Sequence, residues 1–479
     1  MIADVDTVLD LIGFRWMQFL MLIAHSCHTI YVVSEIMGVP SIVVACEFKL
    51  NDTELFLLTS AGFVGMIVSG HYAGYKSDII GRRASLLFAM SLGLISSFLS
   101  LLMPWFYAFL FFRFATGLFV GAVMTNSFTY LVEFTKISLR PIIANFASYP
   151  ICMAGIVVPF INHLNEPLDS VLWSWDTFHV RRWRLCLFFN YVPGLIGLII
   201  IYLLPESVKF LLSIGDGERA YEALDRLCKR NHGKSLSELD VTGVTQPHIR
   251  VSIISHRKFF VRMWYDTKPL FGESYRKPVI LIILIMCGVF FVGNGLNLWF
   301  LKINNQLTAE ERIMCDHLED TTHLTEGNVC SDRPVSYLEN MMLGAASICC
   351  CVFISIMLRL IRRRSVMCIN TIIAALAGFS LNFIKHNKVL LAALLIFIAM
   401  CTTCISLVAS VTADVVPTHL SLLFRRGKAI ALVFMFARFA VIIANCIFGH
   451  FAHTWCLITF NLFVLVTVAV VIMILFLPV

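Results

Sequence analysis

The sequence predicts an all-α polytopic membrane protein with twelve transmembrane helices in two halves of six. Apolar residues make up 59% of its 479 residues and charged residues only 14%, whereas soluble domains contain close to one half and one quarter. The apolar residues also form repeated blocks that are long enough to cross about 30 Å of hydrocarbon as helix. Because a helix satisfies its own backbone hydrogen bonds, repeated blocks of this length indicate a helical bundle.

The expected spans fall into two groups separated by a polar linker. The first group lies near residues 14–36, 55–75, 85–103, 106–130, 142–162 and 185–204. The second group lies near residues 278–301, 337–359, 366–384, 388–412, 427–449 and 455–476. The chain therefore divides into an N-terminal half, a cytosolic linker with short helices and a C-terminal half, which cover residues 1–205, 206–277 and 278–479.

Lysine and arginine in the loops predict the orientation of the bundle. They gather in the linker and in the short loops on one side, at residues 76–83, 136–140, 359–364 and 425–428. The loops on the other side are rich in aspartate and glutamate, at residues 37–54 and 302–336. Three arginines are the exception on that side: Arg181, Arg182 and Arg184. We therefore expect both termini in the cytosol. The net charge of +7 reflects this topology and is no evidence for nucleic acid, so the expected surroundings are a lipid bilayer.

The turn between the second and third spans has the spacing Gly74-x-x-x-Asp78-x-x-Gly81-Arg82-Arg83. A small residue at Gly74 lets two helix backbones approach closely, and Gly81 allows a tight reversal of the chain. Asp78 can face the positive N-terminal end of a neighbouring helix. The alternative is a turn that only carries the positive charge of the cytosolic side, but for that purpose the two arginines would be enough.

This pattern resembles the signature loop of the major facilitator superfamily. Arg113-Phe-Ala-Thr-Gly117 in the fourth span is similar to the second motif of that superfamily. Tyr130-Leu-Val-Glu133-Phe, followed by Arg140, resembles the turn after the fourth span in the organic ion transporters and the synaptic vesicle glycoprotein 2 family. Four further segments resemble the same group, and the last two are most similar to its insect-type members: Trp183-Arg184, Pro205-Glu-Ser-Val-Lys-Phe-Leu211, Asn231-His-Gly-Lys-Ser235 and Gly295-Leu-Asn-Leu-Trp299-Phe300.

The resemblance implies the major facilitator fold and alternating access, in which two six-helix halves rock about a central site near the midplane. It implies a secondary transporter of a small organic ion or solute, with or without a coupling ion, and neither an enzyme nor a cofactor. The alternative is a transporter-shaped protein that acts in vesicle trafficking or binding without transport. We expect a monomer in the plasma membrane or in an intracellular vesicle membrane.

The resemblance also implies a conformational latch at the cytosolic face. Asp78 is expected to contact a helix end of the opposite half, and Arg82 is expected to pair with Glu133 at the foot of the fourth span. The residues assigned to this latch are Gly74, Asp78, Gly81, Arg82, Arg83, Arg113, Glu133 and Arg140. The corresponding loop of the second half, residues 359–364, keeps basic residues but lacks the aspartate and the glycine.

Two ionisable residues inside the spans are candidates for substrate binding or ion coupling, because an unpaired charge in the membrane costs several kcal/mol. The resemblance implies that Glu35 of the first span points toward the central cavity; the alternative is a solvated position at the outer interface. Arg438 of the eleventh span matches an arginine of the organic ion transporters, where it would attract an anionic group or balance an acid. Its alternative is to extend to the cytosolic face, since Arg426 is only about a dozen residues away.

Four uncharged side chains have the same two interpretations. Asn294, Asn297 and Trp299 of the seventh span could supply hydrogen bonds and an aromatic wall for a small organic ligand. Asn126 of the fourth span could contribute in the same way. Each of them is equally compatible with hydrogen bonding between packed helices.

Cys315 and Cys330 both fall in the outer loop, on the oxidising side of the membrane. We expect a disulfide between them, which would close about fifteen residues and contribute about 3 kcal/mol in the entropy model. The cysteines at 349–351, 401 and 404 fall in spans, where cysteine behaves as a small apolar residue. No metal site is expected, because His28 is more consistent with a hydrogen bond inside the bundle.

Overall fold

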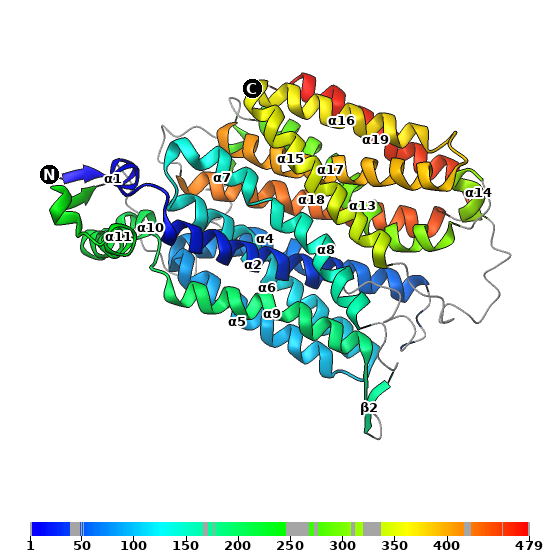
Figure 1. Ribbon diagram of the computed structural model, residues 1–479, viewed down its shortest axis with the longest axis horizontal. Coiled ribbons are helices and arrows are strands. Elements are labelled where there is room, and N and C mark those ends of the chain that lie inside the picture. Colours follow the sequence, from blue (N-terminus) through cyan, green and yellow to red (C-terminus); the bar gives the residue numbers. More distant parts are fainter. Residues whose placement is uncertain are drawn as a thin grey trace.

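The computed structural model describes residues 2–38, 48, 50, 52–165, 171–175, 178–245, 268–272, 276–307, 312–319, 337–415, 423–452 and 454–477. These residues form a bundle of long helices with a group of short elements at one end (Figure 1). We call the end that carries the N-terminal segment and the short elements of the linker the inner end, and the opposite end the outer end. The predicted all-α polytopic class is confirmed, because ten of the described helices are long and apolar enough to cross a membrane.

All six spans expected in the first group are helices. Their bounds are α2 Trp16–Met37, α4 Asp52–Ile80, α5 Arg82–Leu102, α6 Phe106–Glu133, α8 Tyr149–Leu164 and α9 Arg182–Leu203. Pro104 lies between α5 and α6. Proline lacks the N–H group that a continuing helix would need, so it separates the two helices. Two short helices precede α8, namely η1 (Ile137–Leu139) and α7 (Arg140–Phe146). With 16 residues, α8 is apolar but shorter than the ten long spans.

All six spans expected in the second group are helices as well. Their bounds are α13 Arg276–Gln306, α15 Tyr337–Leu360, α16 Arg363–Ser380, α17 Asn387–Val415, α18 Leu423–Phe451 and α19 Cys456–Leu475. α16 begins with two arginines and is not among the ten long apolar helices. The outer end also carries the short helix α14 (Met314–Glu319) and an antiparallel hairpin of β2 (Val171–Trp175) and β3 (Phe178–Arg181) (Figure 1).

The two groups of six helices meet chiefly along two helix pairs, α4 with α18 and α8 with α15. Glycines bring the backbones together in both pairs. A Cβ added to Gly155 of α8 would lie 3.1 Å from the Cα of Gly344 on α15, and one added to Gly74 of α4 would lie 3.4 Å from the Cβ of Ala431 on α18. Small residues permit such close packing, which holds membrane helices together in the absence of a hydrophobic driving force.

The short elements at the inner end bring the N-terminal segment against the linker. They are β1 (Ile2–Asp4), α1 (Val5–Ile12), α10 (Val208–Ser213), α11 (Gly217–His232), the 3-10 helices η2 (Leu236–Leu239) and η4 (Lys268–Phe271), and β4 (Gly243–Thr245). β1 pairs with β4 in parallel, with Ala3 opposite Val244. Apolar residues of α1 and α11 share a buried core: Val8, Leu9, Ile12, Leu224 and Leu227. The short helices of the linker were expected, but β1 and α1 were not.

Arg184, one of the arginines that break the charge pattern of the loops, has a structural explanation. Its guanidinium donates to the backbone carbonyl of Leu101 and, at 3.2 Å, to that of Met103. Both carbonyls lie at the C-terminal end of α5, where helix carbonyls lack intrahelical partners and a cation is favoured by the helix dipole. Arg184 therefore caps the C-terminal end of α5, and this role accounts for a positive charge on the outer side.

Candidate functional site

The turn between α4 and α5 is held in shape by Gly81 and Glu206. Gly81 has a φ of +100°, which L side chains rarely adopt, and an added Cβ would lie 2.6 Å from Oε2 of Glu206. The carboxylate of Glu206 accepts hydrogen bonds from the backbone N–H groups of Arg83 at 2.8 Å and Ala84 at 3.2 Å. These groups belong to the first turn of α5, where N–H groups lack intrahelical partners and a negative charge is favoured.

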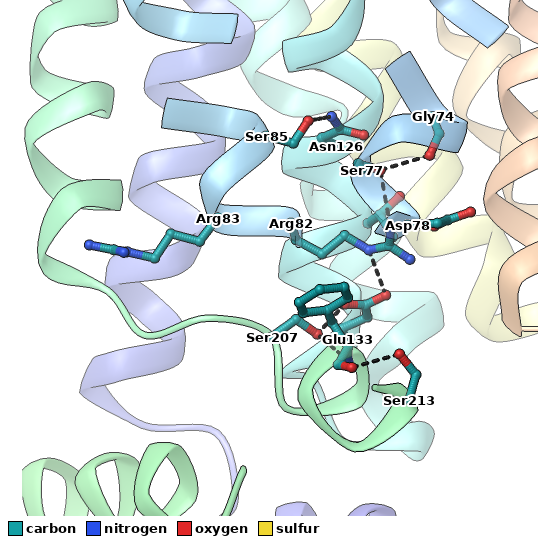
Figure 2. A network of polar contacts seen from close by, with 12 residues as sticks. Gly74, Ser77, Asp78, Arg82, Arg83, Ser85, Asn126, Glu133, Ser207 and Ser213 are labelled. Carbon is teal, nitrogen blue, oxygen red and sulfur yellow. Dashed lines mark hydrogen bonds and ion pairs between the residues drawn. The ribbon is translucent and has the colours of Figure 1, made fainter. Parts of the chain in front are cut away.

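Arg82 is the centre of a buried network at the inner end (Figure 2). Its guanidinium donates to the carboxylate of Asp78, to the hydroxyl of Ser77 at 3.0 Å and, from Nε, to Oε1 of Glu133 at 3.1 Å. The hydroxyl of Ser207 donates to the other carboxylate oxygen of Glu133. The expected pair of Arg82 and Glu133 is therefore confirmed. The network joins α4, α5 and α6 to the segment that leads into α10.

Arg83 extends away from this network (Figure 2). Its guanidinium donates to the backbone carbonyls of Ile201 at 3.2 Å and Tyr202 at 2.6 Å. Both carbonyls lie in the last turn of α9, where carbonyls lack the N–H partners of a continuing helix; that of Ile201 also accepts from the N–H of Leu204 at 3.3 Å. Arg83 thus fastens α5 to α9 within the first six helices.

Arg140 contacts the N-terminal segment, which the sequence had not connected with the latch. Nη2 of Arg140 lies 2.7 Å from Oδ1 of Asp6, and Nζ of Lys209 lies 3.0 Å from the same oxygen. Partial burial of Asp6 opposes ionisation, but Lys209 and Arg140 outweigh it and hold the pKa of the carboxyl below its ordinary value. Burial and the nearby Arg140 lower the pKa of Lys209, and Asp6 offsets this only in part, because one carboxylate serves two cations. Asp6 therefore ties α1 to α7 and α10.

Gly74 of the expected latch lies close to the opposite half, since an added Cβ would lie 3.4 Å from the Cβ of Ala431 on α18. Asp78 lies about one turn further along α4, and its carboxylate binds Arg82 of its own half. The side chains at the N-terminal end of α18, residues 423–429, lie outside those that the structure describes. The contact of Asp78 with a helix end of the opposite half therefore stays a prediction.

Glu35 and Arg113 form a buried ion pair, with Nη1 of Arg113 2.5 Å from Oε2 of Glu35. Arg113 also donates to the backbone carbonyl of Glu35. The placement of Arg113 in the cytosolic latch was wrong, because Arg113 lies twenty residues before Glu133 on α6, or about 30 Å at the rise of an α-helix. Glu35 is 1% exposed, so the alternative of a solvated carboxylate at the outer interface is excluded. The pair joins α2 to α6.

Arg438 is buried between α18 and helices of the opposite half, so it does not extend to the inner face. Its Nη1 donates to the backbone carbonyl of Met66 on α4 at 3.3 Å, and its Nη2 lies 3.9 Å from the sulfur of Met124 on α6. No carboxylate of the described residues lies within ion-pair distance of it. Arg438 therefore places a positive charge at the interface of the two halves.

The three candidate asparagines occupy two different environments. Asn126 is buried and donates to the hydroxyl of Ser85 at 2.9 Å, within the first six helices. This contact favours the interpretation of Asn126 as a helix-packing residue. Asn294 and Asn297 are only partly buried on α13, and neither amide hydrogen-bonds to a residue that the structure describes. They remain candidates for contact with a ligand.

Trp299 fastens helices together toward the outer end. Its indole N–H donates to Oδ1 of Asn445 at 2.8 Å, and Nδ2 of Asn445 donates to the hydroxyls of Thr59 at 2.7 Å and Ser60 at 3.1 Å. The chain of bonds runs from α13 through α18 to α4, and so it crosses between the two halves. Sequence reasoning missed Asn445, although it lies seven residues after Arg438 and therefore on the same helix face.

The expected disulfide was assigned to the wrong partner. Cys315 of α14 is bonded to Cys456, the first residue of α19, with their Cα atoms 5.5 Å apart. Cys456 had been counted as part of an apolar span, but it lies at the outer end of that span, where α14 packs against α19. Cys330 lies outside the described residues.

The sequence profile of the sugar (and other) transporter family matches residues 24–315. The chain belongs to this family. Among curated proteins, the chain is 26% identical over 267 residues to SVOPL of Danio rerio, covering 55% of the chain and 50% of SVOPL. It is 23% identical over 310 residues to synaptic vesicle glycoprotein 2C of Homo sapiens, covering 57% of the chain and 41% of that protein. The chain thus spans about half the length of the curated relatives that it matches.

Solved structures identify the fold of this family member. The xylose transporter XylE from E. coli in its inward open conformation matches with a TM-score of 0.68 and 17% sequence identity, covering 97% of each chain. At this identity the likeness shows the fold alone, which is the major facilitator fold, and the resemblance stated from the sequence is confirmed. The family match includes Glu35, Arg113 and the Arg82 network but ends before Arg438 and Asn445.

Proposed function

We propose that this chain is a secondary transporter that moves a small organic ion or solute across a plasma or vesicle membrane by alternating access. The buried pair of Glu35 and Arg113 carries this proposal. Replacing a buried ion pair by well-packed apolar residues is often neutral or stabilising, by about 1–4 kcal/mol. A bundle that served only as a scaffold would therefore not need this pair, whereas a protein that moves charge would use it.

Glu35 is suited to carry a coupling proton. Arg113 holds its Oε2, whereas its Oε1 is buried and has no hydrogen-bond partner among the described residues. A proton on Oε1 would neutralise the carboxylate, weaken its attraction to Arg113 and allow α2 to move against α6. One protein of the same fold is the proton:xylose symporter XylE, which supports a proton as the coupling ion here.

Small sets of hydrogen bonds between the two halves, near either end of the bundle, support a rocking motion. Toward the outer end, Asn445 of α18 binds Thr59 and Ser60 of α4. Toward the inner end, Asn145 of α7 donates to the hydroxyl of Ser355 on α15 at 2.6 Å. A hydrogen bond between membrane helices contributes about 0.6 kcal/mol on average, so each set can open at a modest cost when the other closes.

Uptake into proteoliposomes tests the proposal. The purified protein is reconstituted with an inward proton gradient and supplied in turn with labelled sugars, organic cations and organic anions. We expect gradient-driven accumulation of one class, lost when a protonophore collapses the gradient. A folded protein, verified by a cooperative melt, that shows neither accumulation nor counterflow of any class would instead support the alternative of a trafficking or binding protein without transport.

A further inference from the structure

Two thiols from opposite halves of the bundle lie against each other. Sγ of Cys152 on α8 is 3.5 Å from Sγ of Cys351 on α15. Both side chains are buried, and neither cysteine belongs to a disulfide. The sulfur atoms of a disulfide are about 2.05 Å apart, so the two sulfurs need to approach by only about 1.5 Å to reach bonding distance.

Contacts on both sides of the two thiols hold α8 and α15 together. Toward the outer end, the backbones of Gly155 and Gly344 are so close that an added Cβ on Gly344 would lie 2.6 Å from the carbonyl carbon of Gly155. Toward the inner end, the hydroxyl of Tyr149 lies 2.9 Å from that of Ser355. The packing of the two helices, and not a chance side-chain rotamer, therefore places the two thiols opposite each other.

We propose that Cys152 and Cys351 form a redox site at which a small peroxide links the two halves covalently. The sulfur of one thiol attacks an oxygen of hydrogen peroxide and the O–O bond breaks; the thiol proton passes to the departing hydroxide, which leaves as water, and the sulfur becomes a sulfenic acid. The second thiol displaces the hydroxyl group from that sulfur, so the S–S bond forms and a second water leaves. Two thiols and one peroxide thus give one disulfide and two waters, and a small thiol reductant returns the two electrons.

A peroxide suits this position because it is small and uncharged and can enter a tightly packed helix interface. The resulting bond would join α8 to α15, which belong to the two groups of six helices. It would thus prevent these helices from separating, and transport would stop until the bond is reduced. The arrest rests on the proposed function, whereas formation of the bond does not.

Chain cleavage and electrophoresis test the bond directly. A site for a specific protease is inserted between Thr245 and Lys268, and the full-length protein is treated with hydrogen peroxide, alkylated, cleaved and run without reductant. We expect the two fragments to migrate together after oxidation and apart after reduction, with a Cys152–Cys351 crosslinked peptide in the mass spectrum. The disulfide of Cys315 and Cys456 does not interfere, because both of its cysteines lie in the second fragment.

The run of three cysteines on α15 supplies matched controls. Cys351→Ser and Cys152→Ala should abolish the crosslink, whereas Cys350→Ser and Cys349→Ser should keep it. Fragments that stay separate in the folded wild-type protein, at peroxide levels that oxidise its exposed Cys349, would overturn the site. Hydrogen exchange tests the arrest without a substrate: the crosslink should slow exchange in α8 and α15 at least tenfold, and unchanged exchange in fully crosslinked protein would overturn the arrest alone.

Discussion

Arg113 of α6 holds the carboxylate of Glu35 of α2 in an ion pair that lies wholly within the first six helices. The two residues are 78 positions apart in the chain. Glu35 had been expected in the central cavity and Arg113 in the cytosolic latch, so their pairing changes the roles of both. Each now depends on the other for charge compensation, which makes the pair a unit in any test of function.

Glu35→Gln is expected to lower stability, because it leaves the guanidinium of Arg113 buried without its counter-charge. Removing one partner of a buried pair costs about 3–5 kcal/mol. The double variant Glu35→Gln with Arg113→Gln should recover much of this loss, and neither variant should keep pH-dependent uptake. Thermal melts of the single and double variants provide the measurement. Equal melting temperatures for wild type and Glu35→Gln would contradict the pairing.

Asp78→Asn is expected to weaken the latch at the inner end, because it removes the carboxylate that binds Arg82 and that is predicted to contact a helix end of the opposite half. A coupling of about 1–3 kcal/mol changes the ratio of two conformations by about 5- to 150-fold. We expect a shift toward inward-facing states, measured by hydrogen exchange at the inner ends of α4 and α5. Ser77→Ala, which removes only a neutral hydrogen bond to Arg82, should shift the ratio less. If hydrogen exchange is unchanged in Asp78→Asn, the turn serves only to set the orientation of the helices in the membrane.

Asn445→Ala is expected to open the outer end, because it removes the bonds from α18 to Thr59 and Ser60 and the acceptor of the Trp299 indole. Together these bonds should contribute about 1–2 kcal/mol. Trp299→Phe is the matched control, since it removes one bond within the second six helices and keeps those between the halves. Labelling of a cysteine introduced near the outer end of α4 should therefore speed up in Asn445→Ala and change little in Trp299→Phe. The reverse order would exclude Asn445 as a link between the halves.

Asp6→Asn is expected to release the N-terminal segment from the inner end of the bundle, because Arg140 and Lys209 lose their shared carboxylate. In the folded protein the pKa of Asp6 lies below its ordinary value of 3.8. The stabilising contribution is therefore fully present above that value and is lost as pH falls through the lowered pKa. Hydrogen exchange of β1 and α1 should rise in the variant at neutral pH, and in the wild type only below about pH 4. If β1 and α1 stay protected from hydrogen exchange in the variant, the docking of this segment depends on its apolar core alone.

The disulfide of Cys315 and Cys456 should appear as a crosslinked peptide in protein purified without reductant. Cys456→Ala should abolish that peptide and lower the melting temperature, because α14 loses its covalent attachment to α19. Cys330→Ala should leave the peptide intact. A peptide that instead joins Cys315 to Cys330 would restore the pairing expected from the sequence.

The sequence by itself determined the class, the positions of the twelve helices and, in the inner network, the pair of Arg82 and Glu133. Hydrophobic blocks are local in the chain, so their positions follow from composition alone. The pair of Arg82 and Glu133 could be predicted because the motifs that contain the two residues resemble those of the major facilitator superfamily, in which this pairing is expected. Asn445 was open to prediction as well, since it shares a helix face with Arg438, but a single amide in an apolar run is a weak signal.

Only the tertiary structure decided the partners of the remaining groups. Glu35 could pair with Arg113, and Cys315 with Cys456 at a separation of 141 residues, only because particular helices became neighbours. Uniformly apolar helices do not encode their neighbours in a periodic pattern, since lipid and protein faces are both apolar. The docking of β1 and α1 was hidden for a related reason: a strand of three residues acquires its identity from β4, the strand that it pairs with, and β4 lies on the far side of six membrane helices in the chain.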